Sequence, residues 1–253
     1  NEYWGYHDGE KRNSRVKRVV EPILILNHDW NINEKSNLET SIGYQFGEMG
    51  NSRLDYAGGG NPSPAYYQDL PSYFLADTDG PDYEGAYIAQ ENFINNGQIN
   101  WNRIYDANLT NNQANLNAAY VLYEDRVDDT QLTINSVFNT EVNENIKLSA
   151  SANYRNLVSD NFAEIFDMLG GQSYSNIDSF DYLDYNLLSP NSIIYEGDKF
   201  KYHYKMNAEE MSLFTMMNFS FNKLEFYLAG DITNTVYQRN GIFENEANAG
   251  NSS

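Results

Sequence analysis

Aromatic rings are the side chains of this sequence with the clearest capacity for binding chemistry. Six of them lie in one stretch that has no regular period: Tyr66, Tyr67, Tyr73, Phe74, Trp101 and Tyr105. Rings add contact area at a low cost in conformational entropy, so loop aromatics favour ligand contacts. The alternative is that the rings pack on one another and hold a long loop folded. We take these six residues as candidate ligand-binding residues.

Catalytic constellations are not evident in the sequence. The three histidines, His7, His28 and His203, are far apart, and none has the short spacing typical of metal ligands. The absence of cysteine excludes thiol catalysis and thiolate metal sites. Nucleophile-elbow, P-loop and dinucleotide fingerprints do not occur. We therefore expect no enzyme activity, no cofactor and no metal centre.

Acidic side chains dominate the charge of the protein. The formal net charge is -20, which argues against nucleic acid as a partner, because phosphate contacts need Lys and Arg. Within the segment DTDGPDYEG, hard oxygen ligands for calcium are available from Asp77, Asp79, Asp82 and Glu84. The spacing does not match an EF-hand loop, and a solvated turn is the alternative interpretation.

Strand patterns explain how the aromatic segment is held. In MSLFTMMNFSFNKLEFYLAG the apolar residues move from odd to even positions across Asn222-Lys223. A tight turn there places Phe221 opposite Leu224 and Phe219 opposite Phe226, so that one face of the ribbon stays apolar. The polar alternate positions then share the other face.

Two further hairpins show the same alternation. Residues 16–48 form one, in which pairing Ile32 with Leu38 puts Leu26 opposite Tyr44; residues 130–156 form another around a turn at 143–145. With 211–238 they make about six strands. Two sets of strand residues are expected on opposite faces. The apolar set includes Phe138, Leu148, Phe219 and Phe226, and the polar set includes Asn135, Asn139, Ser149, Ser151, Asn153, Arg155, Asn218 and Glu225.

The connections between the strands alternate between short and long. Residues of about 50–116 and 159–207 have no sustained period and predict two long loops, whereas the three hairpin turns are short. Short turns at one rim and long loops at the other are typical of an outer-membrane barrel. The sequence therefore predicts an all-β fold, an antiparallel transmembrane β-barrel segment, with the apolar face toward lipid. A soluble sandwich with the apolar face inward shows the same alternation.

Four segments carry a resemblance to a known family: EYWGYHDGEKRNSRVKRVVEPILILNHDW, NPSPAYYQDLPSYF, INWNRIYDAN and FSFNKLEFYLAGDITNTVYQRNG. Over most of its 253 residues the sequence resembles the middle of the barrel of TonB-dependent outer-membrane receptors, of the Bacteroidota kind with a carboxypeptidase-regulatory-like N-terminal domain. The plug and TonB-contacting segment of that family are not visible, and six strands cannot close so wide a barrel. We therefore expect a partial stretch of a receptor.

The resemblance implies an outer-membrane transporter that imports a scarce ligand, such as a siderophore, a cobalamin, a glycan or a peptide. It implies coupling to the TonB complex through the absent N-terminal parts. Lipid, lipopolysaccharide and a surface lipoprotein are the further partners we expect. Two alternatives remain: a secreted soluble β-sandwich that binds through Tyr-rich loops, and a barrel subunit of a surface complex that imports nothing.

Overall fold

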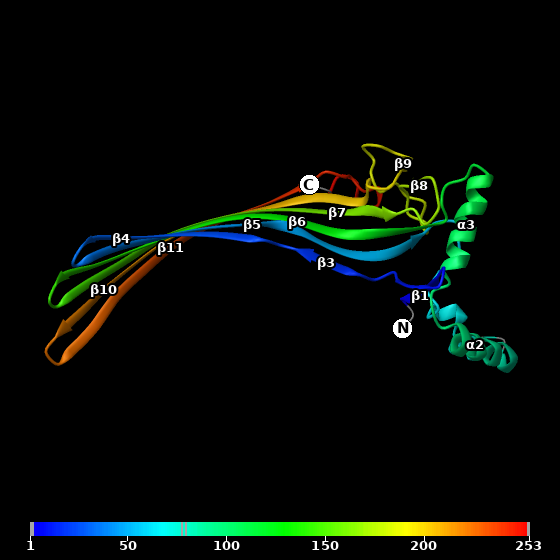
Figure 1. The fold of residues 1–253 in the computed structure, drawn as a ribbon, viewed down its shortest axis with the longest axis horizontal. Helices are drawn as coiled ribbons and strands as arrows, with labels where there is room; N and C mark the ends of the chain where they lie inside the picture. Colours follow the sequence, from blue (N-terminus) through cyan, green and yellow to red (C-terminus); the bar gives the residue numbers. More distant parts are fainter. Residues whose placement is uncertain (1–2, 77, 79, 252–253) are drawn as a thin grey trace.

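The computed structural model describes residues 3–76, 78 and 80–251. Its main feature is one long, curved antiparallel sheet (Figure 1). The strands that build the sheet are β3 (Lys17–Val20), β4 (Ile23–Asn33), β5 (Ser36–Tyr56), β6 (Tyr120–Asn143), β7 (Ile146–Asp167), β10 (Lys199–Phe221) and β11 (Leu224–Gly241). Their spatial order is β11-β10-β7-β6-β5, and both β3 and β4 pair with β5. The all-β class predicted from the sequence is thus confirmed.

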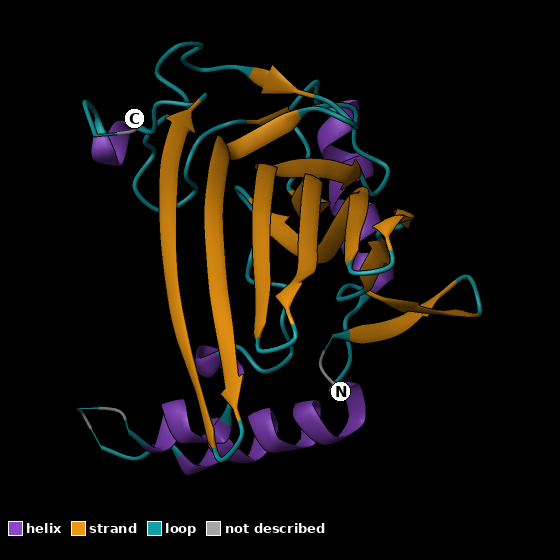
Figure 2. Ribbon diagram, turned by 90° about the vertical axis from the view of Figure 1, so that its left-hand side faces the viewer, coloured by secondary structure: helices purple, strands orange, loops and turns teal. Residues whose placement is uncertain are grey.

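Smaller elements gather at one end of this sheet. They are β1 (Trp4–His7), β2 (Glu10–Asn13), β8 (Tyr174–Ser175), β9 (Ile193–Ile194), α1 (Pro71–Leu75), α2 (Tyr83–Asn96), α3 (Trp101–Gln113) and two 3-10 turns, η1 (Tyr67–Asp69) and η2 (Glu246–Asn248). We call this the loop end, and we call the opposite end, with the three short hairpin turns, the turn end (Figure 1). Seen from the turn end, the strands form a curved wall that is open between β11 and β4 over the residues the structure describes (Figure 2).

Short polar sequences produce the three hairpin turns. Asn33 and Asn143 each accept a hydrogen bond at Oδ1 from the backbone N–H two residues later, which closes an Asx turn. Asn222 has a φ of 42°, a left-handed conformation that asparagine tolerates better than most residues. The predicted pairs Phe221–Leu224 and Phe219–Phe226 are both present.

The register of the first hairpin differs from the prediction. Trp30, not Ile32, pairs with Leu38, and Leu26 pairs with Ile42 instead of Tyr44. An irregularity between Asn31 and Asn33 shifts the pairing near the turn. The shift is two residues, so the apolar side chains keep the predicted face.

Alternation along β6 defines two faces of the sheet. Face A carries Ile134 and Phe138, and face B carries Asn135 and Asn139. The pairing of β6 with β5 is unbroken from Ser36–Thr140 to Tyr56–Tyr120, so each face can be followed from the turn end to the loop end.

The strands extend farther toward the loop end than the sequence predicted. β6 begins at Tyr120 and β7 ends at Asp167, and β10 begins at Lys199. The sequence VLYEDRVDD of β6 hides this extension because charged residues occupy both faces. The apolar and polar alternation that reveals a half-buried strand is therefore lost there.

The two long loops also contain structure that the sequence analysis missed. α2 and α3 lie in the first loop, and the β8–β9 pair lies in the second. Asp82 and Asn100 cap the two helices, accepting hydrogen bonds from the N–H groups of Gly85 and Arg103. Asp and Asn are common N-cap residues, so these two positions were signals in the sequence for the start of a helix.

Candidate functional site

Helix α3 is fastened to the sheet by a buried asparagine. The Asn108 side chain is fully buried; its Nδ2 donates to the carbonyls of Tyr120, Met168 and Leu169. Its Oδ1 accepts from the N–H groups of Ala119 and Tyr120. One side chain thus satisfies backbone groups at the start of β6 and after the end of β7. This residue closes the motif INWNRIYDAN, and the sequence analysis did not single it out.

Trp101 and Tyr105, two of the predicted ligand-binding residues, face the β1–β2 hairpin. Trp101 is fully buried and its Nε1 donates to the carbonyl of Arg12. The Arg12 guanidinium lies 4.7 Å from the Trp101 ring centre and donates to the Tyr105 hydroxyl at 2.6 Å. His7 stacks on the Tyr105 ring at 4.2 Å. The contacts of Trp101 and Tyr105 in the structure are therefore those of packing, the alternative that the sequence left open.

The other four predicted residues lie together. Tyr66, Tyr67, Tyr73 and Phe74 form a chain of edge-to-face contacts, with ring centres 4.9, 5.8 and 5.7 Å apart in that order. Such geometry is favourable for aromatic quadrupoles. Tyr67 and Tyr73 are exposed, while Tyr66 and Phe74 are half-buried. The aromatic chain supports the wall of a neighbouring cleft through Phe74.

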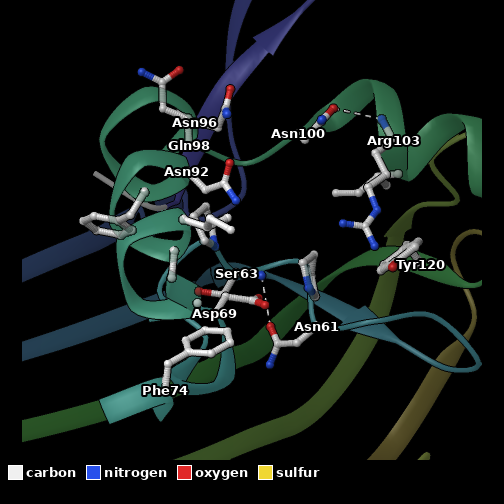
Figure 3. Close-up of a pocket in the computed structure, with 17 residues that line it drawn as sticks. Asn61, Ser63, Asp69, Phe74, Asn92, Asn96, Gln98, Asn100, Arg103 and Tyr120 are labelled. Atoms are coloured by element: carbon white, nitrogen blue, oxygen red, sulfur yellow. Dashed lines mark hydrogen bonds between the residues drawn. The ribbon is translucent and has the colours of Figure 1, made fainter. Parts of the chain in front are cut away.

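That cleft lies between the segment 61–74 and the helices α2 and α3, and has a volume of about 470 Å³. We call it the α2–α3 cleft. Figure 3 shows Asn92, Asn96 and Gln98 on one side of the cleft, and Arg103 and Tyr120 on the other. Its volume falls within the range of small-ligand sites. Residues of the segments NPSPAYYQDLPSYF and INWNRIYDAN thus line one cavity.

Several polar groups of the α2–α3 cleft are held in place. Asn61 donates from Nδ2 to the Tyr56 hydroxyl and accepts from the N–H of Ser63. The Tyr120 hydroxyl donates to the carbonyl of Gly60 at 2.8 Å. Burial, above all, raises the pKa of Tyr120, so this phenol stays neutral. The floor of the cleft is therefore fixed before any ligand arrives.

Other groups of the cleft have no internal partner. Across the described part of the chain, the side chains of Asn92, Asn96, Gln98 and Arg103 take part in no intramolecular hydrogen bond or ion pair. All four are exposed to solvent. They offer donors and acceptors that a ligand can use without breaking protein contacts.

The α2–α3 cleft lies on the face A side of the sheet. Tyr120 lines the cleft, and with Leu122 it packs under α3 in one buried cluster. Both residues have even numbers on β6, as do Ile134 and Phe138, and the pairing with β5 contains no bulge between them. A second cluster, with Val121, Tyr123 and Phe200, is covered by the β8–β9 loop on face B.

Below the helices, face A carries a dense network of charges. Arg126 is 8% exposed and pairs with Glu48 and Asp128, with Glu164 at 3.6 Å and Glu124 at 3.8 Å. Arg18 bridges Glu48 and Glu124. Burial is the main cause of the raised pKa values of Asp128 and Glu164, and it outweighs the opposing effect of Arg126. We call these residues, with Asp160, Lys199 and His203, the charged network.

His203 and Lys199 share one carboxylate at the edge of this network. His203 Nε2 donates to Asp160 Oδ1 at 2.8 Å, and Lys199 Nζ donates to Asp160 Oδ2 at 3.1 Å. Burial raises the pKa of Asp160, but the bonds from Lys199 and His203 outweigh it and leave the pKa below its usual value. The pKa of His203 is lowered, chiefly by burial, although Asp160 opposes this.

Toward the turn end, face A becomes apolar and stays uncovered. The members of this apolar band are Leu24, Leu26, Trp30, Leu38, Ile42, Tyr44, Phe46, Leu132, Ile134, Phe138, Leu148, Ala150, Ala152, Tyr154, Met211, Leu213, Met217, Phe219, Phe226, Leu228 and Ile232. Leu213 is 62% exposed and Ile232 75% exposed. Side chains of this kind and number are normally buried against a second layer or another apolar phase.

Metal-binding groups are not assembled in the described residues, where no cluster of three or more His, Asp or Glu side chains could hold an ion. Asp77 and Asp79 of the segment DTDGPDYEG lie outside the described residues. Asp82 of the same segment serves as the cap of α2. Among the helices of the described chain, none has the length and apolarity needed to cross a membrane.

Comparison with known proteins adds no family to this picture. No protein-family model, curated protein or solved structure gives a significant match to the chain. The structure therefore defines the chain as an antiparallel all-β wall with helix-bearing loops at one end.

Proposed function

We propose that this chain forms part of the wall of an outer-membrane, TonB-dependent receptor that imports a scarce ligand. Face A then contacts lipid, and face B lines a water-filled lumen. The observation that carries this proposal is the apolar band on face A. It is broad and exposed, and it lies beside short turns at one end and long structured loops at the other, as a barrel wall requires.

The height of the band suits a bilayer. On β10 it runs from Met211 to Phe219. Eight residue steps at about 3.3 Å, in a strand tilted by about 40°, span roughly 20 Å along the membrane normal. This is close to the height of about 25 Å of the apolar belt of outer-membrane barrels.

The band also runs obliquely across the strands. One row of paired residues is polar on β5 and β6, at Ser36 and Thr140, and apolar from β7 to β11, at Leu148, Met217 and Leu228.

A row nearer the loop end shows the reverse change. It is apolar at Tyr44 and Leu132 and polar at Asn156 and Glu209, with Val236 of β11 as the exception. A membrane plane crosses tilted strands in this oblique way.

The number of residues by which the band shifts from one strand to the next agrees with a tilt of the strands. On β5 the band is centred at Ile42, between Leu38 and Phe46. On β10 it is centred at Thr215, which pairs through Ala150 and Phe138 with Leu38, four positions from Ile42. A tilt of about 40° with strands about 4.8 Å apart predicts a drift of about four residues over three strand steps.

Energy coupling and import rest on the resemblance of the sequence to TonB-dependent receptors. Polar side chains of face B support a wet lumen on the other side of the wall. Asn135 there hydrogen-bonds to Asn153, and Asn153 to Ser212 at 3.2 Å. Such a ladder of amides and hydroxyls is compatible with water contact on that face.

Cysteine labelling in the membranes of producing cells tests the orientation. The chain contains no cysteine, so single replacements can be read without background. We expect Leu213→Cys to react with a bilayer-confined maleimide, and the neighbouring Ser212→Cys to react only with a water-soluble reagent. If Leu213→Cys is protected from both reagents, its side chain lies in a protein core. That outcome favours the soluble sandwich over the receptor wall.

A further inference from the structure

Under the proposed function, the α2–α3 cleft lies outside the barrel wall. The location of the site in this inference rests on that proposed function. The cleft lies on the face A side, beyond both the apolar band and the charged network. A ligand there sits outside the wall, above the outer leaflet. It does not sit in the lumen through which an imported molecule would pass.

The lining of the cleft is polar but nearly neutral. Neutral amides predominate, and the charged groups are one cation, Arg103, and one carboxylate, Asp69. A polyanion needs several cations, and a cationic ligand needs several carboxylates, so neither suits this balance. Amides both donate and accept hydrogen bonds, which matches neighbouring hydroxyls of a sugar ring.

Apolar surfaces stand beside these amides. Phe93 is 42% exposed, and Phe74 is the end member of the edge-to-face chain that begins at Tyr66. Ring faces of this kind can pack against the C–H face of a pyranose while amides bind its rim.

One side of the cleft offers two amides at a helical spacing. Asn92 and Asn96 are one turn apart on α2 and lie on the same side of the cleft (Figure 3). We propose that the α2–α3 cleft binds a neutral saccharide chain at the outer side of the wall. Two sources supply this chemistry: the sugar part of an outer-leaflet glycolipid, and a free oligosaccharide.

The test uses the full protein in lipid nanodiscs and an array of neutral oligosaccharides, acidic oligosaccharides and peptides. We expect binding to neutral saccharides. The double variant Asn92→Ala/Asn96→Ala should bind roughly tenfold more weakly, because neutral hydrogen bonds are lost. The matched control is Asn95→Ala, which lies on the same helix but outside the cleft lining and should bind as the parent does. An unchanged thermal melt shows that each variant is folded.

Nanodiscs made with and without the glycolipid of the producing cell distinguish the two sources. If the protein binds a free saccharide only when the glycolipid is absent, the glycolipid occupies the cleft. If binding is equal in both, the free oligosaccharide is the ligand. Selective binding of peptides or acidic sugars overturns the proposal, and so does binding that the double variant leaves unchanged.

The proposed function can fail separately from this inference. Labelling of Leu213→Cys in the same nanodiscs reports the orientation of face A, whereas the array reports the ligand class. Saccharide binding with Leu213→Cys protected from lipid leaves the ligand class intact and removes only the place beside the membrane.

Discussion

The two halves of face A differ in the polarity and burial of their side chains, although the same strands form both. Near the turn end its side chains are apolar and exposed, as Leu213 and Leu228 show. Near the loop end the same face carries the buried charged network and then the cluster under α3. The boundary falls within continuous strands: Phe46 and Glu48 are neighbours on this face of β5.

The difference indicates that the two halves of face A suit different surroundings. A buried guanidinium is tolerated only when carboxylates and hydrogen bonds replace its water, and Arg126 has four carboxylates close by. The apolar band has no carboxylate among its members, and Glu48 and Glu209 border it toward the loop end, so the surroundings that we propose for the band are apolar. One face therefore carries protein-covered charge and uncovered hydrocarbon within a single sheet.

The largest expected effect comes from breaking the charged network. Arg126→Ala should lower the free energy of unfolding by about 3–5 kcal/mol, because it leaves several buried carboxylates without their shared cation. Urea titration in detergent measures this. The control is Arg155→Ala on exposed face B, where the arginine donates a hydrogen bond to the Gln131 side chain and the loss should be small. Equal losses of unfolding free energy at both positions would mean that the burial of Arg126 in the charged network adds nothing to stability.

Reversing the character of the apolar band should have the next largest effect. Leu213→Arg should destabilise the protein in bilayers by about 2–4 kcal/mol if the site is near the midplane, because lipid cannot solvate the charge. Ser212→Arg, one residue away on face B, should be nearly neutral. Folding titrations into lipid vesicles compare the two variants. A Ser212→Arg variant that loses as much as Leu213→Arg would refute the assignment of the faces.

The smallest effect concerns the pH dependence of the charged network. Since the folded pKa of His203 is lowered, the unfolded chain binds a proton there at higher pH, and stability falls as pH drops below about 6.5. Lys199 and Lys205 add to this direction, and Asp160 opposes it.

The variant His203→Gln should therefore flatten the unfolding midpoint between about pH 7 and pH 5. The acid loss due to Asp160, whose pKa is also lowered, should persist at lower pH in both proteins. A midpoint that still falls between pH 7 and pH 5 in the variant would assign the titration to another group.

Much of the sheet was predictable from local pattern. Alternation specifies which side chains share a face, and the asparagines at the turns specify where the chain reverses, as the pair Phe221–Leu224 shows. The two-residue shift in the pairing of Ile32 could not be predicted from the sequence, because both registers place the same side chains on the same face.

The candidate site was less predictable. The sequence grouped Trp101 and Tyr105 with the four clustered rings, but both pack against the β1–β2 hairpin, and Asn92 and Asn96 of the cleft gave no local signal. Cleft lining depends on which helix face meets which loop. That is a property of long-range packing.

The sequence alone determined the strand faces, the turns and the polarity of the turn-end half, since these depend on neighbours two residues apart and on residue type. Only the tertiary structure decided that Arg126 would meet Glu48 and Glu164, and that α3 would cover face A instead of face B. Glu48 and Glu164 come from strands on either side of Arg126, and Asn108 positions α3 through backbone groups beyond its own helix. Contacts between segments so far apart in sequence arise when the strands pair, because pairing brings their side chains within reach.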